Sequence, residues 1–109
     1  MAAQDALLTA WPTVERYVML LRQRGIRVED AYVFGSCASG ADDGDSDIDV
    51  AIVSRDLTGR RLEDQLRLME LRREIDLRIE PHPFRPERFT ADNPEALEIM
   101  ETGVRLKGV

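Results

Sequence analysis

Two aspartates separated by one residue carry the strongest chemical signal in the sequence. Asp47 and Asp49 head a run of β-forming residues that continues to Val53. Because alternate side chains of a strand point to the same face, the two carboxylates would project together, with Cα atoms about 6.5 to 7 Å apart. Carboxylates at this spacing can share a pair of divalent cations, which stabilise the attacking and leaving oxygens in phosphoryl transfer. Oxygen ligands without a cysteine or histidine cluster favour Mg²⁺ or Mn²⁺ over zinc.

A third carboxylate, Asp76, lies on the polar face of a later segment. From Ile75 to Glu80 apolar and charged residues alternate strictly, which predicts a third strand. If this strand lies beside the one that begins at Asp47, Asp76 falls close in register to the aspartate pair and completes the metal ligand set. Glu80 shares its face but would lie about 13 Å further along the strand, too far to join the same metals. We therefore expect Asp76 to be the third catalytic ligand.

A glycine-serine turn precedes the aspartate pair. Gly35 and Ser36 follow the short β-like run 30–34. Without a Cβ, Gly35 lets the backbone approach a phosphate, and the Ser36 hydroxyl and the following amides can hydrogen-bond it. Such a turn is a weak signal alone, because ordinary turns use the same residues. Combined with the aspartate pair, it indicates a site for a phosphorylated substrate.

The rest of the sequence predicts the elements that position these residues. Apolar residues at helical spacing predict an amphipathic helix over 5–24, divided or kinked at Pro12, and a second helix from residue 58 or 59 to 73. Asn93 and Pro94 open a final helix, which runs to Glu101. The proline-rich segment 81–86 is expected to be an extended loop, because proline cannot donate a ladder hydrogen bond.

These elements predict an α/β, or α+β, fold in a single domain over residues 1–109. A short mixed sheet would carry helices on one face and present the acids on the other. The expected core consists of apolar residues of the strands and of the second helix: Val33, Ile48, Val50, Ile52, Leu66, Met69, Ile75, Leu77 and Ile79.

Composition excludes several classes of partner. The net charge of −6 argues against non-specific binding to nucleic acid or to anionic membranes, which depends on clustered Lys and Arg. A single cysteine, Cys37, and the absence of a signal-like N-terminus or a long apolar run indicate a cytoplasmic setting. The oligomeric state, including a homo-oligomer, stays open.

The central residues also form a recognisable pattern. Gly35-Ser36, Gly40, Ser46, Asp47 and Asp49 read G-S-x(3)-G-x(5)-S-D-x-D. With this pattern the sequence resembles the nucleotidyltransferase superfamily of DNA polymerase beta type, and specifically its minimal, MNT-type members. The resemblance covers roughly residues 31–80 and implies a polymerase-beta-like core.

The resemblance assigns roles to individual residues. It implies that the Gly35-Ser36 turn binds the nucleotide triphosphate, that Asp47 and Asp49 bind two Mg²⁺ ions, and that Asp76 completes the site. Two positions depart from the pattern, since members often carry Arg where Cys37 and Ser39 stand here. The loop that follows is acidic, so extra positive charge beside the triphosphate is missing.

The expected function is a Mg²⁺-dependent transfer of a nucleoside monophosphate, AMP from ATP, to an acceptor hydroxyl. The resemblance further implies pairing with a small helical HEPN-type protein, with this chain as the antitoxin of a toxin-antitoxin pair. Two alternatives stay open: a non-catalytic module that neutralises such a partner by complex formation, and a catalytically silent nucleotide or metal binder. His82, the single histidine, is expected to be an exposed or half-packed loop residue rather than a substrate contact.

Overall fold

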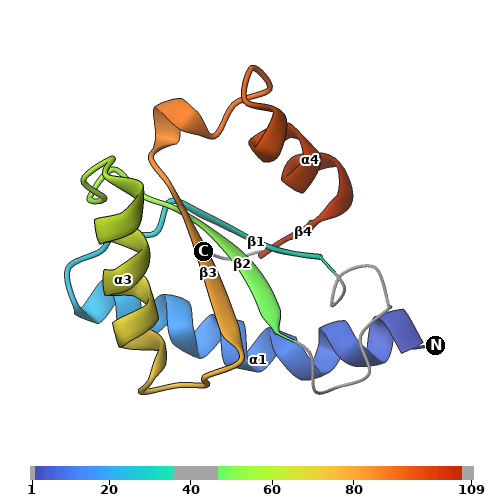
Figure 1. The fold of residues 1–109 in the computed structure, drawn as a ribbon. Helices are drawn as coiled ribbons and strands as arrows, with labels where there is room; N and C mark the ends of the chain where they lie inside the picture. The colour runs from blue at the N-terminus through green and yellow to red at the C-terminus, as the bar shows by residue number, and fades with distance from the viewer. Residues whose placement is uncertain (1, 36–46, 107–109) are drawn as a thin grey trace.

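The computed structural model describes residues 2–35 and 47–106, with side chains from residue 10 onward. Figure 1 shows a small sheet with helices packed around it. In chain order the elements are α1 (Ala2–Gln23), β1 (Asp30–Phe34), β2 (Ile48–Val53), α3 (Arg61–Arg72), β3 (Ile79–Phe84), the 3₁₀ helix η1 (Pro86–Arg88), α4 (Pro94–Thr102) and β4 (Val104–Arg105). Within these residues no helix is long and apolar enough to cross a bilayer.

The strands form one mixed sheet in the order β3-β2-β1-β4. β1 pairs antiparallel with both β2 and β4, whereas β2 and β3 run parallel and are connected through α3. A parallel pair needs such a crossover, because a tight turn cannot return the chain to the same end of the sheet. The predicted α+β fold with a mixed sheet is therefore confirmed.

Helices cover the two faces of the sheet unequally. One face packs against α1 and α3 in the larger core, where Val33, Val50 and Ile52 are fully buried. The opposite face packs partly against α4, through Ala51 and the α4 residue Ile99 (Figure 1). The expectation that helices cover only one face is thus corrected, because α4 covers part of the face that carries the acids.

The buried side of α3 differs from the predicted one. Leu62 and Leu66 are 72% and 57% exposed, whereas Asp64 and Leu68 are buried. The Asp64 carboxylate accepts hydrogen bonds from the backbone N–H groups of Thr58 and Gly59 and from the Thr58 hydroxyl, at 2.8 to 3.0 Å. These hydrogen bonds satisfy the buried carboxylate at the start of α3. The side of the helix that carries Asp64 and Leu68 can therefore face the core.

The predicted core is correct for the strands and partly wrong elsewhere. Val33, Ile48, Val50, Ile52 and Ile79 are buried. Leu66 and Leu77 are exposed, which makes them the incorrect core predictions. Met69 and Ile75 are half-buried, and Ile75 packs at the edge of the larger core.

The third strand lies four residues later than predicted. β3 spans Ile79–Phe84, so it includes Pro81 and Pro83, while residues 73–78 form turns after α3. The backbone carbonyls of Arg78 and Phe84 accept hydrogen bonds from the N–H groups of Ile48 and Ser54. The backbone polar groups of even-numbered residues therefore face β2, and those of the odd-numbered residues between them face the unpaired edge of the sheet. Proline is tolerated there, because β3 is an edge strand among the described residues and an outward position needs no N–H donor.

Side chains of α3 cover this outward edge. Gln65 donates to the carbonyl of Pro81 at 3.1 Å, and Arg72 donates to the carbonyl of Ile79 at 2.8 Å. The edge therefore offers neither free N–H groups at its prolines nor free carbonyls at these two positions, which protects it from pairing with another strand.

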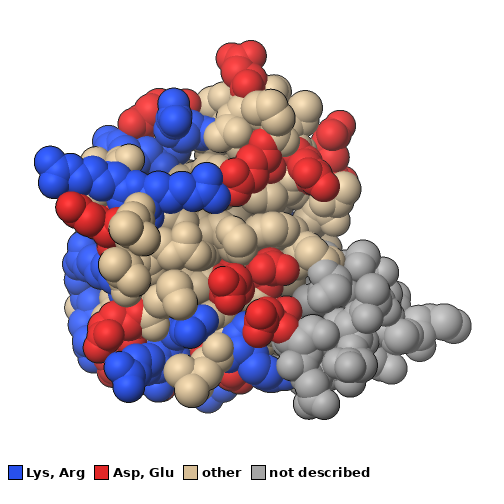
Figure 2. Space-filling view, in the orientation of Figure 1, with Lys and Arg blue, Asp and Glu red and all other residues tan. Residues whose placement is uncertain are grey.

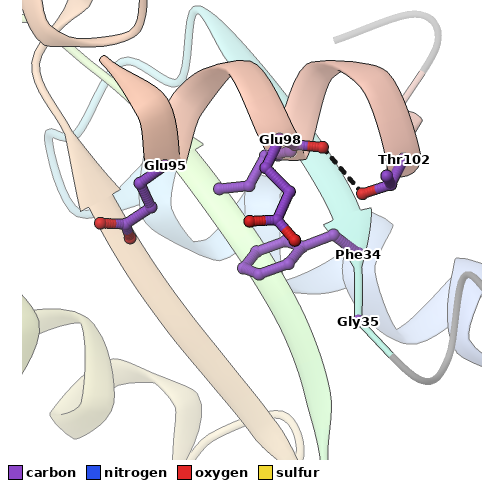
Figure 3. Close-up of a pocket in the computed structure, with 6 residues that line it drawn as sticks. Phe34, Gly35, Glu95, Glu98 and Thr102 are labelled. Atoms are coloured by element: carbon purple, nitrogen blue, oxygen red, sulfur yellow. Dashed lines mark hydrogen bonds between the residues drawn. The ribbon is translucent and has the colours of Figure 1, made fainter.

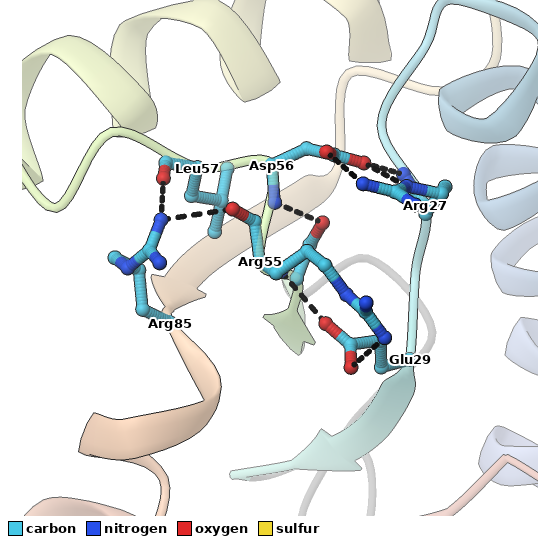
Figure 4. A network of polar contacts seen from close by, with 7 residues as sticks. Arg27, Glu29, Arg55, Asp56, Leu57 and Arg85 are labelled. Atoms are coloured by element: carbon cyan, nitrogen blue, oxygen red, sulfur yellow. Dashed lines mark hydrogen bonds and ion pairs between the residues drawn. The ribbon is translucent and has the colours of Figure 1, made fainter.

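A polar network holds the end of the sheet that lies beyond the C-terminus of β2 (Figure 4). Arg27 donates three hydrogen bonds to the Asp56 carboxylate at 2.8 to 2.9 Å, and they hold the pKa of Asp56 well below its ordinary value. Arg85 donates to the carbonyls of Arg55 and Leu57. These contacts connect the segments before β1, after β2 and after β3.

One buried hydrogen bond between α1 and α3 can be tested directly. Tyr17 is fully buried and its hydroxyl donates to the carbonyl of Leu68 at 2.7 Å. We expect Tyr17→Phe to lower the free energy of unfolding by about 1 kcal/mol, the usual net value of such a bond. Tyr32→Phe is the matched control, since no described residue hydrogen-bonds the Tyr32 hydroxyl. Urea unfolding measures both, and equal effects of the two substitutions would contradict the assigned role.

Candidate active site

Asp49 lies at the open end of the sheet face that α4 partly covers. It is the second residue of β2, and by strand alternation it shares its face with Ala51 and Val53. Those two residues belong to the smaller core under α4, whereas the Asp49 side chain is 28% exposed and Asp47 is exposed just before the strand. In Figure 2 acidic side chains gather below a band of uncharged surface. Carboxylates are thus available to solvent at this end.

The structure brings the glycine turn against Asp49. Phe34 of β1 is the register partner of Asp49, and Gly35 follows with φ +74°. A Cβ built on Gly35 would lie 2.4 Å from Oδ2 of Asp49, so a side chain at position 35 would force the carboxylate to move. Glycine therefore suits this position in two ways, through its positive φ and through the room it leaves for the Asp49 carboxylate. Ser36, the other predicted phosphate-binding residue, lies outside the described residues.

His82 contacts the other oxygen of the same carboxylate. Its Nε2 lies 3.2 Å from Oδ1 of Asp49, and its ring packs edge-on against Phe34 with centroids 4.8 Å apart. Sequence reasoning placed His82 in a loop and missed this contact. The available signal was the alternation of Glu80 and His82 with Pro81 and Pro83, which fits an edge strand whose proline nitrogens lie on the unpaired edge.

The register of β3 changes the identity of the third carboxylate. Glu80 is the register partner of Asp49 on the adjacent strand, so both residues lie on one face of the sheet. The expected position of Asp76 beside the aspartate pair is wrong, because Asp76 precedes β3 and lies in the turn region after α3. The expectation that Glu80 lies too far from the pair is wrong as well, because the strand begins at Ile79 and puts Glu80 in register with Asp49.

Asp76 has a local partner instead. Its Oδ1 accepts from the backbone N–H of Arg78 at 2.8 Å, and its Oδ2 accepts from Nη2 of the same arginine at 3.1 Å. The Arg78 side chain holds the pKa of Asp76 below its ordinary value. These bonds close the turn that leads from α3 into β3.

The chemistry of the acids fits a hard divalent cation, although the full ligand set is not assembled. Asp47, Asp49 and Glu80 supply carboxylate oxygens, which Mg²⁺ prefers. Because residue 35 is a glycine, no side chain of its own competes with Oδ2 of Asp49 at this turn. Within residues 2–35 and 47–106, however, no three His, Cys, Asp or Glu side chains lie close enough together to hold a metal. The geometry thus provides candidate ligands on two adjacent strands.

A cavity of about 460 Å³ adjoins Gly35, between the end of β1 and helix α4. Its walls are formed by Phe34, Gly35, Glu95, Glu98, Ile99 and Thr102. In Figure 3 the Glu98 carboxylate lies beside the Phe34 ring, while Glu95 points away from it. Glu95 is paired with Arg61 at 3.1 Å. The cavity therefore combines an aromatic wall with a carboxylate that acts as a hydrogen-bond acceptor.

Comparison with known proteins gives one family and one fold. A family model described as "Nucleotidyltransferase domain" matches residues 14–100, which is most of the chain. The fold is similar to a crystal structure of a provisionally assigned nucleotidyltransferase from Sulfolobus solfataricus, with a TM-score of 0.66 and 18% sequence identity. That match covers 96% of this chain and 86% of the other. No curated protein matches the chain.

The contact between Gly35 and Asp49 has a matched internal control. Gly25 also has a positive φ, +85°, but an added Cβ there would meet nothing within 4 Å. We expect both Gly25→Ala and Gly35→Ala to introduce backbone strain of about 1 to 2 kcal/mol. Gly35→Ala should lower the free energy of unfolding by about 1 to 3 kcal/mol more, because its methyl group overlaps the carboxylate. Urea unfolding of the two variants decides this, and equal losses would refute the close approach.

Proposed function

Because the chain belongs to the nucleotidyltransferase-domain family, we propose that it transfers a nucleoside monophosphate, AMP from ATP, to an acceptor hydroxyl in a Mg²⁺-dependent reaction. One observation carries the proposal: the glycine of the turn expected to bind phosphate lies directly against the Asp49 carboxylate expected to bind metal. A triphosphate held at this turn would have its oxygens next to that carboxylate.

The proposed roles follow the geometry. Asp47 and Asp49 would hold the cations, and Glu80 takes the place of Asp76 as the third carboxylate because it is in register with Asp49. Bound Mg²⁺ would neutralise negative charge that develops on the phosphate oxygens. In the transfer, the acceptor oxygen bonds to the α-phosphorus, the bond from that phosphorus to the bridging oxygen breaks, and pyrophosphate leaves. One of the three carboxylates named above would take the proton of the attacking hydroxyl.

The cavity beside Gly35 is the proposed place of the nucleoside. Phe34 and Ile99 offer apolar contact to a flat base, and the Glu98 carboxylate can accept a hydrogen bond from an exocyclic amino group such as that of adenine. The acidic wall disfavours phosphate in the cavity itself. The triphosphate would therefore extend from the cavity toward the Gly35 turn.

Substitutions of the four acids test the proposal. We expect Asp47→Asn, Asp49→Asn and Glu80→Gln each to lower Mg²⁺-dependent label transfer from α-labelled ATP by about 100-fold or more. Asp76→Asn should change transfer by no more than about twofold, because that residue serves a turn. The transfer assay needs a known acceptor. Calorimetry with Mg²⁺ and a non-hydrolysable ATP analogue measures nucleotide binding by the same variants without one. Unchanged transfer and binding in the Asp49→Asn variant would refute the assignment.

A second candidate function is a binding module that neutralises a small helical HEPN-type partner by complex formation. The observation that favours it is the exposure of Leu62 and Leu66, which lie one turn apart on the solvent side of α3. Exposed leucines in this arrangement form an apolar strip suited to pack against a helix. In this function the acids would not be needed for neutralisation.

Neutralisation of a co-expressed HEPN-type ribonuclease, scored by cell growth, separates the two candidates. If binding alone suffices, the double variant Asp47→Asn and Asp49→Asn protects the cells, whereas Leu62→Glu with Leu66→Glu does not. Met19→Glu is the control, because Met19 is 59% exposed, close to the value of Leu66, but lies on α1. If nucleotidyl transfer neutralises the partner, the aspartate variant fails to protect. Protection by every variant would contradict the binding-module function.

A further inference from the structure

The Asp49 carboxylate is held from two sides, and its two oxygens have different neighbours. Oδ2 lies against the Gly35 backbone, as the 2.4 Å approach to an added Cβ shows. Oδ1 lies 3.2 Å from Nε2 of His82. One oxygen therefore faces the turn expected to bind phosphate, and the other faces a histidine on the neighbouring strand.

His82 is itself fixed in place by the fold. Its backbone is the register partner of Ala51 on β2, and its ring packs edge-on against Phe34. The side chain is 22% exposed, so most of the ring is removed from solvent. A side chain restrained by strand pairing and ring packing can direct its Nε2 at one chosen atom.

The direction of the hydrogen bond follows from the acceptor. An ionised carboxylate can only accept hydrogen bonds, so the Nε2 atom facing Oδ1 must carry the proton. The bond fixes the rotation of the carboxylate about its terminal torsion, which in an unrestrained aspartate is broad. Oδ1 is then satisfied by His82, while Oδ2 faces the Gly35 turn.

We propose that His82 is a positioning residue that holds Asp49 with Oδ2 presented to a divalent cation, on the side from which the nucleotide phosphates arrive. This inference rests on the proposed function. His82 acts through Asp49 and contacts neither the phosphate nor the metal. Groups that orient a metal ligand from behind typically change metal affinity by about 10- to 100-fold when they are removed.

Mn²⁺ binding, followed by electron paramagnetic resonance, measures this role without turnover. The experiment compares tag-free wild-type protein with His82→Leu, which removes the donor, and with His82→Gln, whose side-chain N–H can replace it. We expect His82→Leu to weaken Mn²⁺ binding about 10-fold or more and His82→Gln to restore most of the affinity. A residue that only filled space would show no such rescue, because glutamine replaces the ring poorly in packing.

The single histidine provides a second readout that does not require metal. Imidazole ¹H–¹⁵N correlation spectra of the wild type should show the proton on Nε2, both before and after Mg²⁺ is added. A proton found on Nδ1 alone, or an Nε2 proton lost when Mg²⁺ binds, would overturn the inference.

The outcomes separate the inference from the function on which it rests. If wild type and His82→Leu bind Mn²⁺ equally well, the positioning role is refuted and the metal site stands. If the wild type binds no Mn²⁺ with or without a non-hydrolysable ATP analogue, the proposed function itself is refuted. Thermal unfolding of each variant confirms that the compared proteins are folded.

Discussion

The approach of the Gly35 backbone to the Asp49 carboxylate is the contact on which the candidate site depends. It follows from the antiparallel pairing of β1 and β2, in which Phe34 lies opposite Asp49 and the chain then turns at Gly35. A side chain at position 35 would occupy the place of Oδ2. Turn and carboxylate therefore form one unit, and a ligand bound at the turn is within reach of the acid.

The packing of the helices leaves this unit open. The larger core under α1 and α3 buries one face of the sheet, while α4 covers the other face around Ala51 and Val53. At the far end of β2 the arginine and carboxylate network joins the connecting segments. This network holds one end of the sheet, whereas the opposite end, which carries Asp49, is partly exposed.

Sequence reasoning succeeded where local pattern and tertiary role agree. The first two strands and the three helices lie close to the predicted residues, although α1 continues through Pro12 as one helix and α3 buries a side other than the one its leucines mark. The N-cap Asn93, for example, accepts from the backbone N–H of Glu95 as expected, and Pro94 follows it.

The incorrect predictions concern residues whose role depends on the sheet order or on tertiary hydrogen bonds. Pro81 and Pro83 argued against a strand, but an outward position on an edge strand needs no donor, and that position is known only from the sheet order. The shift of β3 replaced Asp76 with Glu80 opposite Asp49 and brought His82 into contact with Asp49. The buried face of α3 was missed because it contains a charged residue, Asp64, whose hydrogen bonds become apparent only in the folded chain.

A crystal structure with Mn²⁺ and a non-hydrolysable ATP analogue tests the central claim most directly, because anomalous scattering locates the metal without ambiguity. The account predicts Mn²⁺ bound by Asp47, Oδ2 of Asp49 and Glu80, with the phosphates on the Gly35 turn and Asp76 still bonded to Arg78. A metal ligated by Asp76 in place of Glu80, or a nucleotide bound away from Gly35, would contradict it.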